Sequence, residues 1–147
     1  DYFASSKCSN SEFWANVASE TRSKFILFTH CTSPMISVKT YEKTIKSFFS
    51  NHNNFDSLNT VSEVKEFLFL NKKPINFKLN KAPNSQNLPD ITKLNFAISI
   101  LKTKFMERKK TLIGNRPLFF KLDQVEGHDI NTEYEFEFAK YLFRNSR

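Results

Sequence analysis

The stretch SKFILFTHCTSP, residues 23–34, joins an apolar run to an abrupt polar end. Consecutive apolar residues from Phe25 to Phe28 are typical of a short strand that is buried on both faces of a sheet. The polar residues 29–33 follow, and Pro34 ends the segment. The stretch therefore predicts a buried strand and a loop. Three interpretations of the loop stay open: a nucleophile with its base, a loop that holds a phosphate, or the polar end of the strand.

Helical and strand-like patterns alternate along the rest of the chain. They predict, in order, a helix over residues 11–23, the strand 25–28, a helix over 37–50, a polar loop over 51–59 that leads into a brief strand, a strand over 64–70, a long basic loop over 71–90 with one edge strand at 75–79, a helix over 91–109, a strand over 117–122 and a closing helix. Buried strands that alternate with helices indicate an α/β fold. We expect a small, mostly parallel sheet of about four strands flanked by helices, with a leading helix.

The closing segment NTEYEFEFAKYLFRNSR, residues 131–147, fits two patterns. Apolar residues alternate with Glu from residue 134 to 138, as in a strand. Thr132 and Glu135 instead have the spacing of a capping box, which begins a helix. Length and the capping box favour the helix.

The composition is that of a globular domain that makes its turns with little glycine. The 147 residues are 39% hydrophobic and 25% charged, with 17 Phe and two Gly, so a glycine-rich phosphate loop is excluded. We expect a disordered start over residues 1–10 and a single domain over 11–145. The two Cys indicate a reducing compartment, no apolar run approaches the length of a membrane span, and a nuclear location is the default expectation.

Positive charge gathers in the long loop. The formal net charge of +7 favours acidic partners. Lys72, Lys73, Lys78 and Lys81 are spaced to reach phosphate groups, but no helix combines basic and amide side chains on one stripe to read bases. Binding of DNA or RNA through this loop is one interpretation, and charges that merely keep a Phe-rich domain soluble are the other.

The sequence contains no strong catalytic or metal-binding motif. His30 and Cys31 are adjacent, and neighbouring residues on a strand point to opposite faces, so His30 does not readily serve as a base for Cys31. His52 and His128 lie in polar loops without a supporting pattern, and no spacing brings two metal ligands onto one face. We expect no metal site, no cofactor and no enzymatic activity. A Cys31-dependent enzyme is the least favoured alternative.

Trp14 is the one tryptophan of the chain and lies on the leading helix. An exposed Trp is a favoured anchor for a protein partner. The same residue on the apolar face of a helix also fits a place in the core. Both interpretations are kept.

The order of elements from residue 24 onward resembles a BRCT domain preceded by a helix, a variant found in regulators of DNA replication and gene silencing. The matching segments are KFILFTHC as the first strand, Val38 to Phe49 as the first helix, VKEFLFL as the third strand, ITKLNFAISILKTKF as the second helix, RPLFFKL as the last strand and YEFEFAKYLF as the closing helix. Phosphopeptide-binding members use a Ser or Thr after the first strand and a Lys at the start of the second helix. Thr29 or Thr32 and Lys93 occupy those places here.

This resemblance implies a non-enzymatic protein-interaction module of a nuclear scaffold or regulator acting on chromatin. Its partner would be a short segment of another protein, acidic or phosphorylated, and no membrane or small-molecule substrate is implied. The contact residues would be Thr29, Thr32, Ser33 and Lys93, where strand end and helix start favour an anion, together with Trp14. The alternative is a nucleic-acid-binding domain that uses the loop around residues 72–81.

Overall fold

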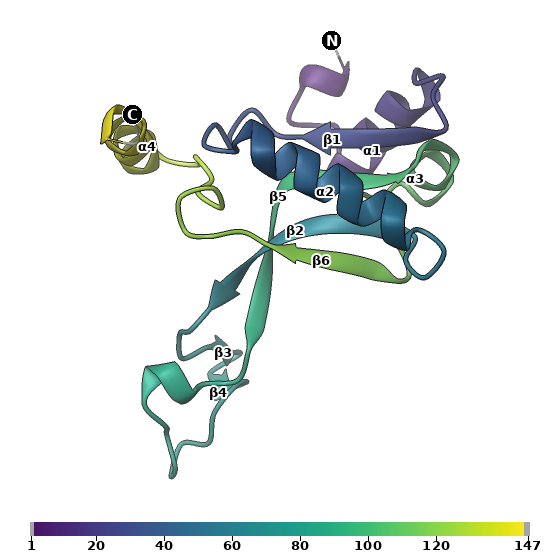
Figure 1. The fold of residues 1–147 in the computed structure, drawn as a ribbon. Coiled ribbons are helices and arrows are strands. Elements are labelled where there is room, and N and C mark those ends of the chain that lie inside the picture. Colours follow the sequence, from purple (N-terminus) through teal and green to yellow (C-terminus); the bar gives the residue numbers. More distant parts are fainter. Residues whose placement is uncertain (1, 146–147) are drawn as a thin grey trace.

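The computed structural model describes residues 2–145 and has an α/β architecture (Figure 1). Its elements are η1 (Tyr2–Ala4), α1 (Asn10–Ser19), β1 (Phe25–Thr29), α2 (Val38–Asn51), β2 (Ser57–Val64), β3 (Phe69–Leu70), β4 (Lys73–Pro74), η2 (Ser85–Asn87), β5 (Ile91–Lys102), α3 (Thr103–Lys109), β6 (Pro117–Lys121) and α4 (Glu133–Asn145). The prediction of a small α/β fold with a leading helix is confirmed.

The main sheet has the strand order β1-β5-β2-β6. β5 is antiparallel to both of its neighbours, whereas β2 and β6 are parallel. The sheet is therefore mixed, and the expectation that it would be mostly parallel is not confirmed. Because β1, β2 and β6 run in one direction, their carboxyl ends lie at the same edge of the sheet.

Helices cover both faces of this sheet (Figure 1). On one face, Ala18 of α1 and Met106 of α3 pack with Ile26 and Leu101 of the sheet. On the other face, Phe48 of α2 packs with buried residues of β2 and β5. The apolar run of β1 serves both layers because successive side chains of a strand point to opposite faces. The prediction of a short strand buried between two layers is confirmed.

The helix expected over residues 91–109 is wrong. Residues 91–102 form the long central strand β5, and only Thr103–Lys109 are helical. Opposite Asn59 and Val61 of β2, which are two residues apart, β5 places Ser99 and Leu94, which are five residues apart. Phe96 lies within this irregularity with a φ of 54°. Ile98 and Leu101 pack on opposite faces of β5, so this strand, buried on both faces, has apolar residues at the spacing of a helix.

The strand expected over residues 64–70 is also wrong, because β2 ends at Val64. The segment 51–59, expected to be mostly a polar loop, already contains the start of this central strand at Ser57. Asn59 and Thr60 are fully buried there, and their side chains are hydrogen-bonded. Buried polar residues conceal a core strand because they interrupt its apolar run.

Residues 65–90 form an arm that projects from the body of the molecule (Figure 1). It contains the β3–β4 hairpin and a small aromatic cluster in which the ring of Phe77 lies 4.9 Å from that of Phe67 and 5.4 Å from that of Phe69. The buried Asn76 joins the two sides of the arm: it accepts from the Leu68 N–H at 2.9 Å and donates to the Glu66 carbonyl at 2.8 Å. The edge strand expected at 75–79 is absent from this described segment.

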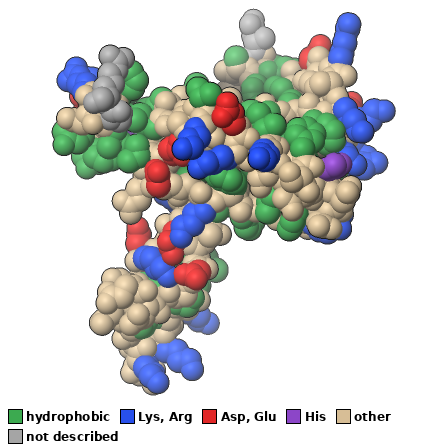
Figure 2. All heavy atoms as spheres, in the orientation of Figure 1, with side chains coloured by type: hydrophobic (Ala, Val, Ile, Leu, Met, Phe, Trp, Pro, Cys, Tyr) green, Lys and Arg blue, Asp and Glu red, His purple; other side chains and the backbone are tan. Residues whose placement is uncertain are grey.

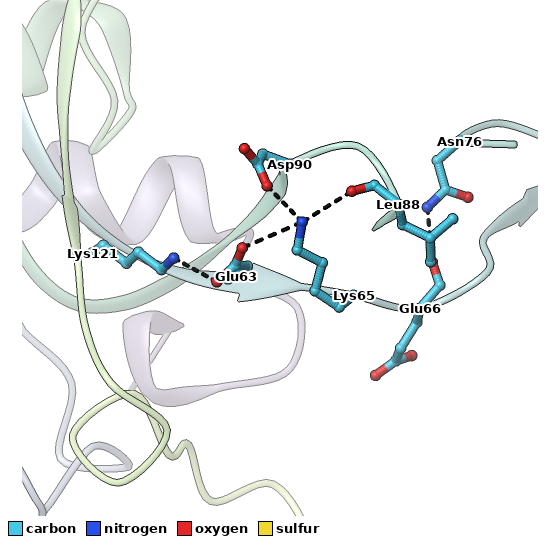
Figure 3. Close-up of polar contacts among 7 residues, drawn as sticks. All are labelled: Glu63, Lys65, Glu66, Asn76, Leu88, Asp90 and Lys121. Carbon is cyan, nitrogen blue, oxygen red and sulfur yellow. Dashed lines mark hydrogen bonds and ion pairs between the residues drawn. The ribbon is translucent and has the colours of Figure 1, made fainter. Parts of the chain in front are cut away.

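Lys65 holds together the two ends of the arm (Figure 3). Its Nζ donates to the Leu88 carbonyl at 2.9 Å and to the Asp90 carboxylate at 2.6 Å, and it lies 3.6 Å from Glu63. Lys121 pairs with the second oxygen of Glu63. The hydrogen bond from Lys65 lowers the pKa of the Asp90 carboxyl below its ordinary value of 3.8. This cluster fixes the neck through which the arm leaves the sheet.

We expect Lys65→Gln to loosen the arm without unfolding the body. Exposed ion pairs contribute little to global stability, but this one is the contact that joins residues 88 and 90 to the end of β2. Amide hydrogen exchange at Leu68 and Ile75, whose N–H groups donate within the arm, should become faster. Lys81→Gln removes the same charge from the exposed part of the arm and is the control. Equal exchange rates in both variants would contradict the role of Lys65.

The predicted helices near the two ends of the chain are confirmed, with shifted bounds. α1 begins after a capping box made by Ser9 and Glu12 and ends at Ser19 rather than 23. α4 begins after Thr132, whose hydroxyl accepts from the Glu135 N–H at 3.3 Å. Only Ala139 of α4 is buried, and the helix stands at one side of the body (Figure 1).

α2 is also confirmed as a helix, and it packs on the sheet through Phe48 and Tyr41 of its apolar stripe, whereas Ile45 and Phe49 are exposed. Its buried residues are Thr40, Thr44 and Phe48, at a spacing of four. Val38, the first residue of the helix, is 75% exposed. Among the residues described, no helix has both the length and the apolar character needed to cross a membrane.

Candidate functional site

A pocket of about 320 Å³ lies beyond the carboxyl ends of the parallel strands β2 and β6. It is lined by Ser62 and Glu63 of β2, residues 93–95 of β5, and polar residues of the 124–135 segment. Ligands of α/β sheets bind outside the carboxyl ends of the strands, where the connecting loops diverge. The position and the polar lining make this pocket the candidate site.

The loop between β6 and α4 forms one wall of the pocket and is anchored to the body at three points. The Leu122 N–H donates to the Val61 carbonyl at 2.9 Å, and the Ile130 N–H donates to the Thr32 carbonyl at 2.9 Å. Between them, the Glu126 carboxylate accepts from the Thr40 hydroxyl at 2.7 and 2.8 Å, at the start of α2. These contacts hold the wall in place before any ligand binds.

Asn95 shapes the opposite wall. Its Oδ1 accepts from the Thr60 hydroxyl at 2.7 Å, and its Nδ2 donates to the Ser62 hydroxyl at 2.9 Å. Gly127 lies directly against this pair: a Cβ added there would be 2.5 Å from Ser62 Oγ and 2.9 Å from the Asp123 carbonyl oxygen. The two walls therefore meet at a position that has no room for a side chain.

His128 and Asp129, in the loop before α4, contribute an imidazole and a carboxylate to the pocket. His128 Nε2 lies 2.8 Å from the Glu135 carbonyl oxygen, which can only accept, so Nε2 is the donor and Nδ1 is the ring nitrogen left for a ligand. The Asp129 carboxylate accepts from the Asn131 side-chain amide at 2.9 Å. Lys93 adds a positive charge. The pocket thus offers amides, one lysine and the three carboxylates of Glu63, Asp129 and Glu135, a set that suits a hydroxyl-rich ligand with one phosphate contacted by Lys93.

The Glu135 carboxylate is held in its ionised form. The Asn131 N–H donates to it at 2.8 Å and the Thr132 hydroxyl at 2.9 Å, and these bonds lower the pKa of Glu135 below its ordinary value of 4.5. A lowered carboxyl pKa stabilises the fold above the pKa of the unfolded chain, and this contribution is lost as the pH falls through the folded pKa.

We therefore expect the start of α4 to loosen in acid. The carbon signal of the Glu135 carboxyl, followed by NMR during a pH titration, should have its midpoint below 4.5. Thr132→Ala removes one of the donated hydrogen bonds and should move that midpoint upward. A midpoint at or above 4.5 in the unchanged protein would contradict the capping arrangement.

The structure separates the residues that the sequence grouped as one contact set. Lys93 lines the pocket, whereas the Thr29 hydroxyl donates to the Ala97 carbonyl at 2.7 Å and Ser33 is buried. Thr32 contributes its carbonyl to the loop anchor, and Trp14 is half-buried, its ring 6.2 Å from that of Phe96.

The other candidate residues lie elsewhere. The lysines of the arm, Lys72, Lys73, Lys78 and Lys81, are exposed. The His30 ring packs against Phe28 at 5.2 Å, and Cys31 is exposed in the following turn. Of the three interpretations of the 29–33 loop, these contacts favour the polar end of a buried strand. Residues 2–145 contain no group of three or more His, Cys, Asp or Glu placed to hold a metal ion.

Most residues that line the pocket are not among the site residues expected from the sequence; Lys93 is the exception. His128 lies in a polar loop without a supporting pattern, and Asn95 falls inside the helix expected over residues 91–109. The stretch EGHDIN, residues 126–131, carried the signal: a glycine and several polar residues gather between an apolar strand and a capped helix. That combination is typical of a functional loop at a sheet edge.

No protein-family model and no curated protein matches this sequence. Several solved structures match the fold. The bifunctional IspDF from Campylobacter jejuni matches with a TM-score of 0.63 and 11% identity over 86% of this chain and 33% of that chain. The 4-diphosphocytidyl-2C-methyl-D-erythritol synthase from Anaerococcus prevotii matches with a TM-score of 0.68 and 10% identity over 94% of this chain and 68% of that chain. CMP:2-keto-3-deoxy-manno-octonic acid synthetase complexed with CTP matches with a TM-score of 0.60 and 9% identity over 95% of this chain and 69% of that chain.

The fold is thus shared with these solved structures. At these identities the likeness concerns the fold, and this chain spans 33% of the first of those proteins and about two thirds of the other two. The resemblance to BRCT domains is wrong. The second helix of that comparison, which begins at Ile91, is a central antiparallel strand, and the matched structures are of another class.

The expectation of a non-enzymatic interaction module in chromatin, gene silencing or DNA replication rested on the BRCT resemblance and is contradicted with it. The nucleic-acid-binding alternative rests on the basic loop around residues 72–81 instead, and the matched structures give it no support. The structures with this fold are enzymes. The expectation of a protein partner without a small-molecule substrate is contradicted as well, because one of the matched enzymes was solved with CTP.

Proposed function

We propose that this chain forms part of a nucleotidyltransferase that transfers a cytidylyl group from CTP to a hydroxyl group of a polyhydroxylated acceptor. The observation that carries the proposal is the place of the polar pocket, beyond the carboxyl ends of β2 and β6 in a fold shared with a CTP-complexed synthetase. The names of two matched enzymes contain a cytidine group joined to a sugar-like compound.

The chemistry of the pocket agrees with such a transfer. The acceptor oxygen attacks the α-phosphorus of CTP, a new P–O bond forms, and the bond from the α-phosphorus to the bridging oxygen breaks, releasing pyrophosphate. The hydroxyl proton passes to a base, for which the pocket offers His128 Nδ1 and the Asp129 carboxylate. Lys93 attracts the phosphates, and the amides of Gln124 and Asn131 are suited to hydroxyl groups.

The test is the affinity of CTP for the protein, measured by calorimetry, for the unchanged chain and for Lys93→Gln. Loss of a charge-assisted contact to phosphate should weaken binding by about tenfold. Lys72→Gln removes the same charge from the arm and should leave the affinity unchanged. Pyrophosphate release in the presence of 2-keto-3-deoxy-manno-octonic acid is the second readout. Equal CTP affinity in Lys93→Gln and the unchanged chain would contradict the proposal.

A further inference from the structure

A second pocket, of about 490 Å³, lies at the opposite end of the sheet. It is formed where the loop after α1 leads into β1 and where β5 passes into α3. The Thr103 N–H donates to the Lys24 carbonyl at 3.1 Å and fixes these two segments against each other. Lys93 of the first pocket and Lys102 of the second lie near opposite ends of β5.

Four cationic side chains line this second pocket: Arg22, Lys24, Lys102 and Lys104. Glu107 is the one carboxylate in its lining. Within the described residues 2–145, none of the four cations has a carboxylate within ion-pair distance. Figure 2 shows Lys and Arg side chains gathered at the end of the body where β1 begins. Four positive charges around one cavity outnumber its single carboxylate and repel one another, so an anion bound among them would relieve that repulsion.

An independent observation comes from Thr103, which lines the same pocket. This residue is only 4% exposed, and its Oγ1 is buried without a hydrogen-bond partner. A buried hydroxyl is normally hydrogen-bonded, because leaving it unpaired is unfavourable. A phosphate oxygen in the pocket would supply the missing acceptor.

We propose that this second pocket binds a compact polyphosphate group, a diphosphate or triphosphate chain, through Arg22, Lys24, Lys102 and Lys104, with Thr103 as a neutral donor. The volume is suited to a small anion, and several cations around one cavity favour a ligand that carries several negative charges. The site shares no lining residue with the pocket of the proposed function.

The probes are inorganic tripolyphosphate and ATP, titrated at physiological ionic strength and followed by amide NMR signals. Tripolyphosphate should shift the signals of Lys24 and Thr103. If ATP shifts them as well, the site accepts the chain on a nucleotide; if tripolyphosphate alone does so, it takes the free chain. Shifts confined to residues 127–131 for both probes would overturn the proposal, because that pattern places the phosphates in the first pocket.

Three variants distinguish binding at this pocket from non-specific electrostatic attraction of the anion to the protein surface. Arg22→Gln/Lys104→Gln should weaken tripolyphosphate binding at least about tenfold, while Lys72→Gln/Lys73→Gln, with the same change of net charge, should have little effect. Thr103→Val keeps the side-chain shape, should fold with an unchanged or higher melting temperature, and should weaken binding about threefold to tenfold. Equal weakening in both double variants would overturn the proposal, and so would undiminished binding in Thr103→Val.

Discussion

Asn59→Ala should destabilise the protein by about 3 kcal/mol, since each buried group left without a partner costs about 1–3 kcal/mol. Asn59 is fully buried in β2 and joins three parts of the core. Its Nδ2 donates to Ser99 Oγ at 3.0 Å and to the Leu112 carbonyl at 2.9 Å, and its Oδ1 accepts from Ser57 Oγ at 2.8 Å. Truncation leaves several buried groups unpaired in the centre of the sheet.

The measurement is denaturant unfolding of Asn59→Ala beside Asn80→Ala, an exposed position in the arm. The control should change the free energy of unfolding by no more than about 0.5 kcal/mol. If Asn59→Ala matched the control, the polar centre of β2 would not contribute as its hydrogen bonds indicate.

Gly127→Ala should abolish ligand binding in the pocket between β2, β5 and the 124–135 segment. The new Cβ would lie 2.9 Å from the Asp123 carbonyl oxygen, a backbone atom that also accepts the Gly127 N–H at 2.9 Å. Relief of this overlap requires the turn to open, which moves His128 and Asp129 away from Ser62. We expect a loss of stability of about 1–3 kcal/mol, typical of overpacking, and CTP affinity reduced by at least about tenfold.

Gly114→Ala is the matched control for this prediction. A Cβ at Gly114 would collide with the Asp56 carboxylate, near the start of β2 and away from the pocket. Both variants should therefore lose stability, whereas Gly127→Ala alone should lose CTP affinity. Unchanged CTP affinity in a folded Gly127→Ala protein would show that the turn does not shape the site.

The elements that could be predicted from the sequence are those specified by local signals. The apolar run of β1 and the capping box of α4 each lie within a few consecutive residues, and the structure contains both. The central strands β2 and β5 could not be predicted in this way. Buried polar residues interrupt β2, and burial of both faces of β5 gives its apolar residues the spacing of a helix. Both features depend on neighbours that are distant in the sequence.

The candidate site could be predicted from the sequence only in part, for the same reason. Lys93 is among the contact residues expected from the sequence, but it is expected at the start of a helix, whereas it lies in β5. Ser62, Asn95 and Gly127 meet because β2 pairs with β5 on one side and with β6 on the other. Nothing local marks Gly127 as the point of contact, because its φ is not in the left-handed region and its importance comes from the Ser62 side chain alongside it.

The measurement that tests the central claim most directly is a titration of the isotope-labelled protein with CTP, followed by backbone amide signals. The account predicts saturable shifts at Lys93, Gly127, His128 and Asp129, which line the pocket beyond β2 and β6. These shifts should be lost in Gly127→Ala and kept in Lys72→Gln. CTP that leaves those four signals unmoved, whether or not others shift, would contradict the assignment of this pocket to a nucleotidyl-transfer site.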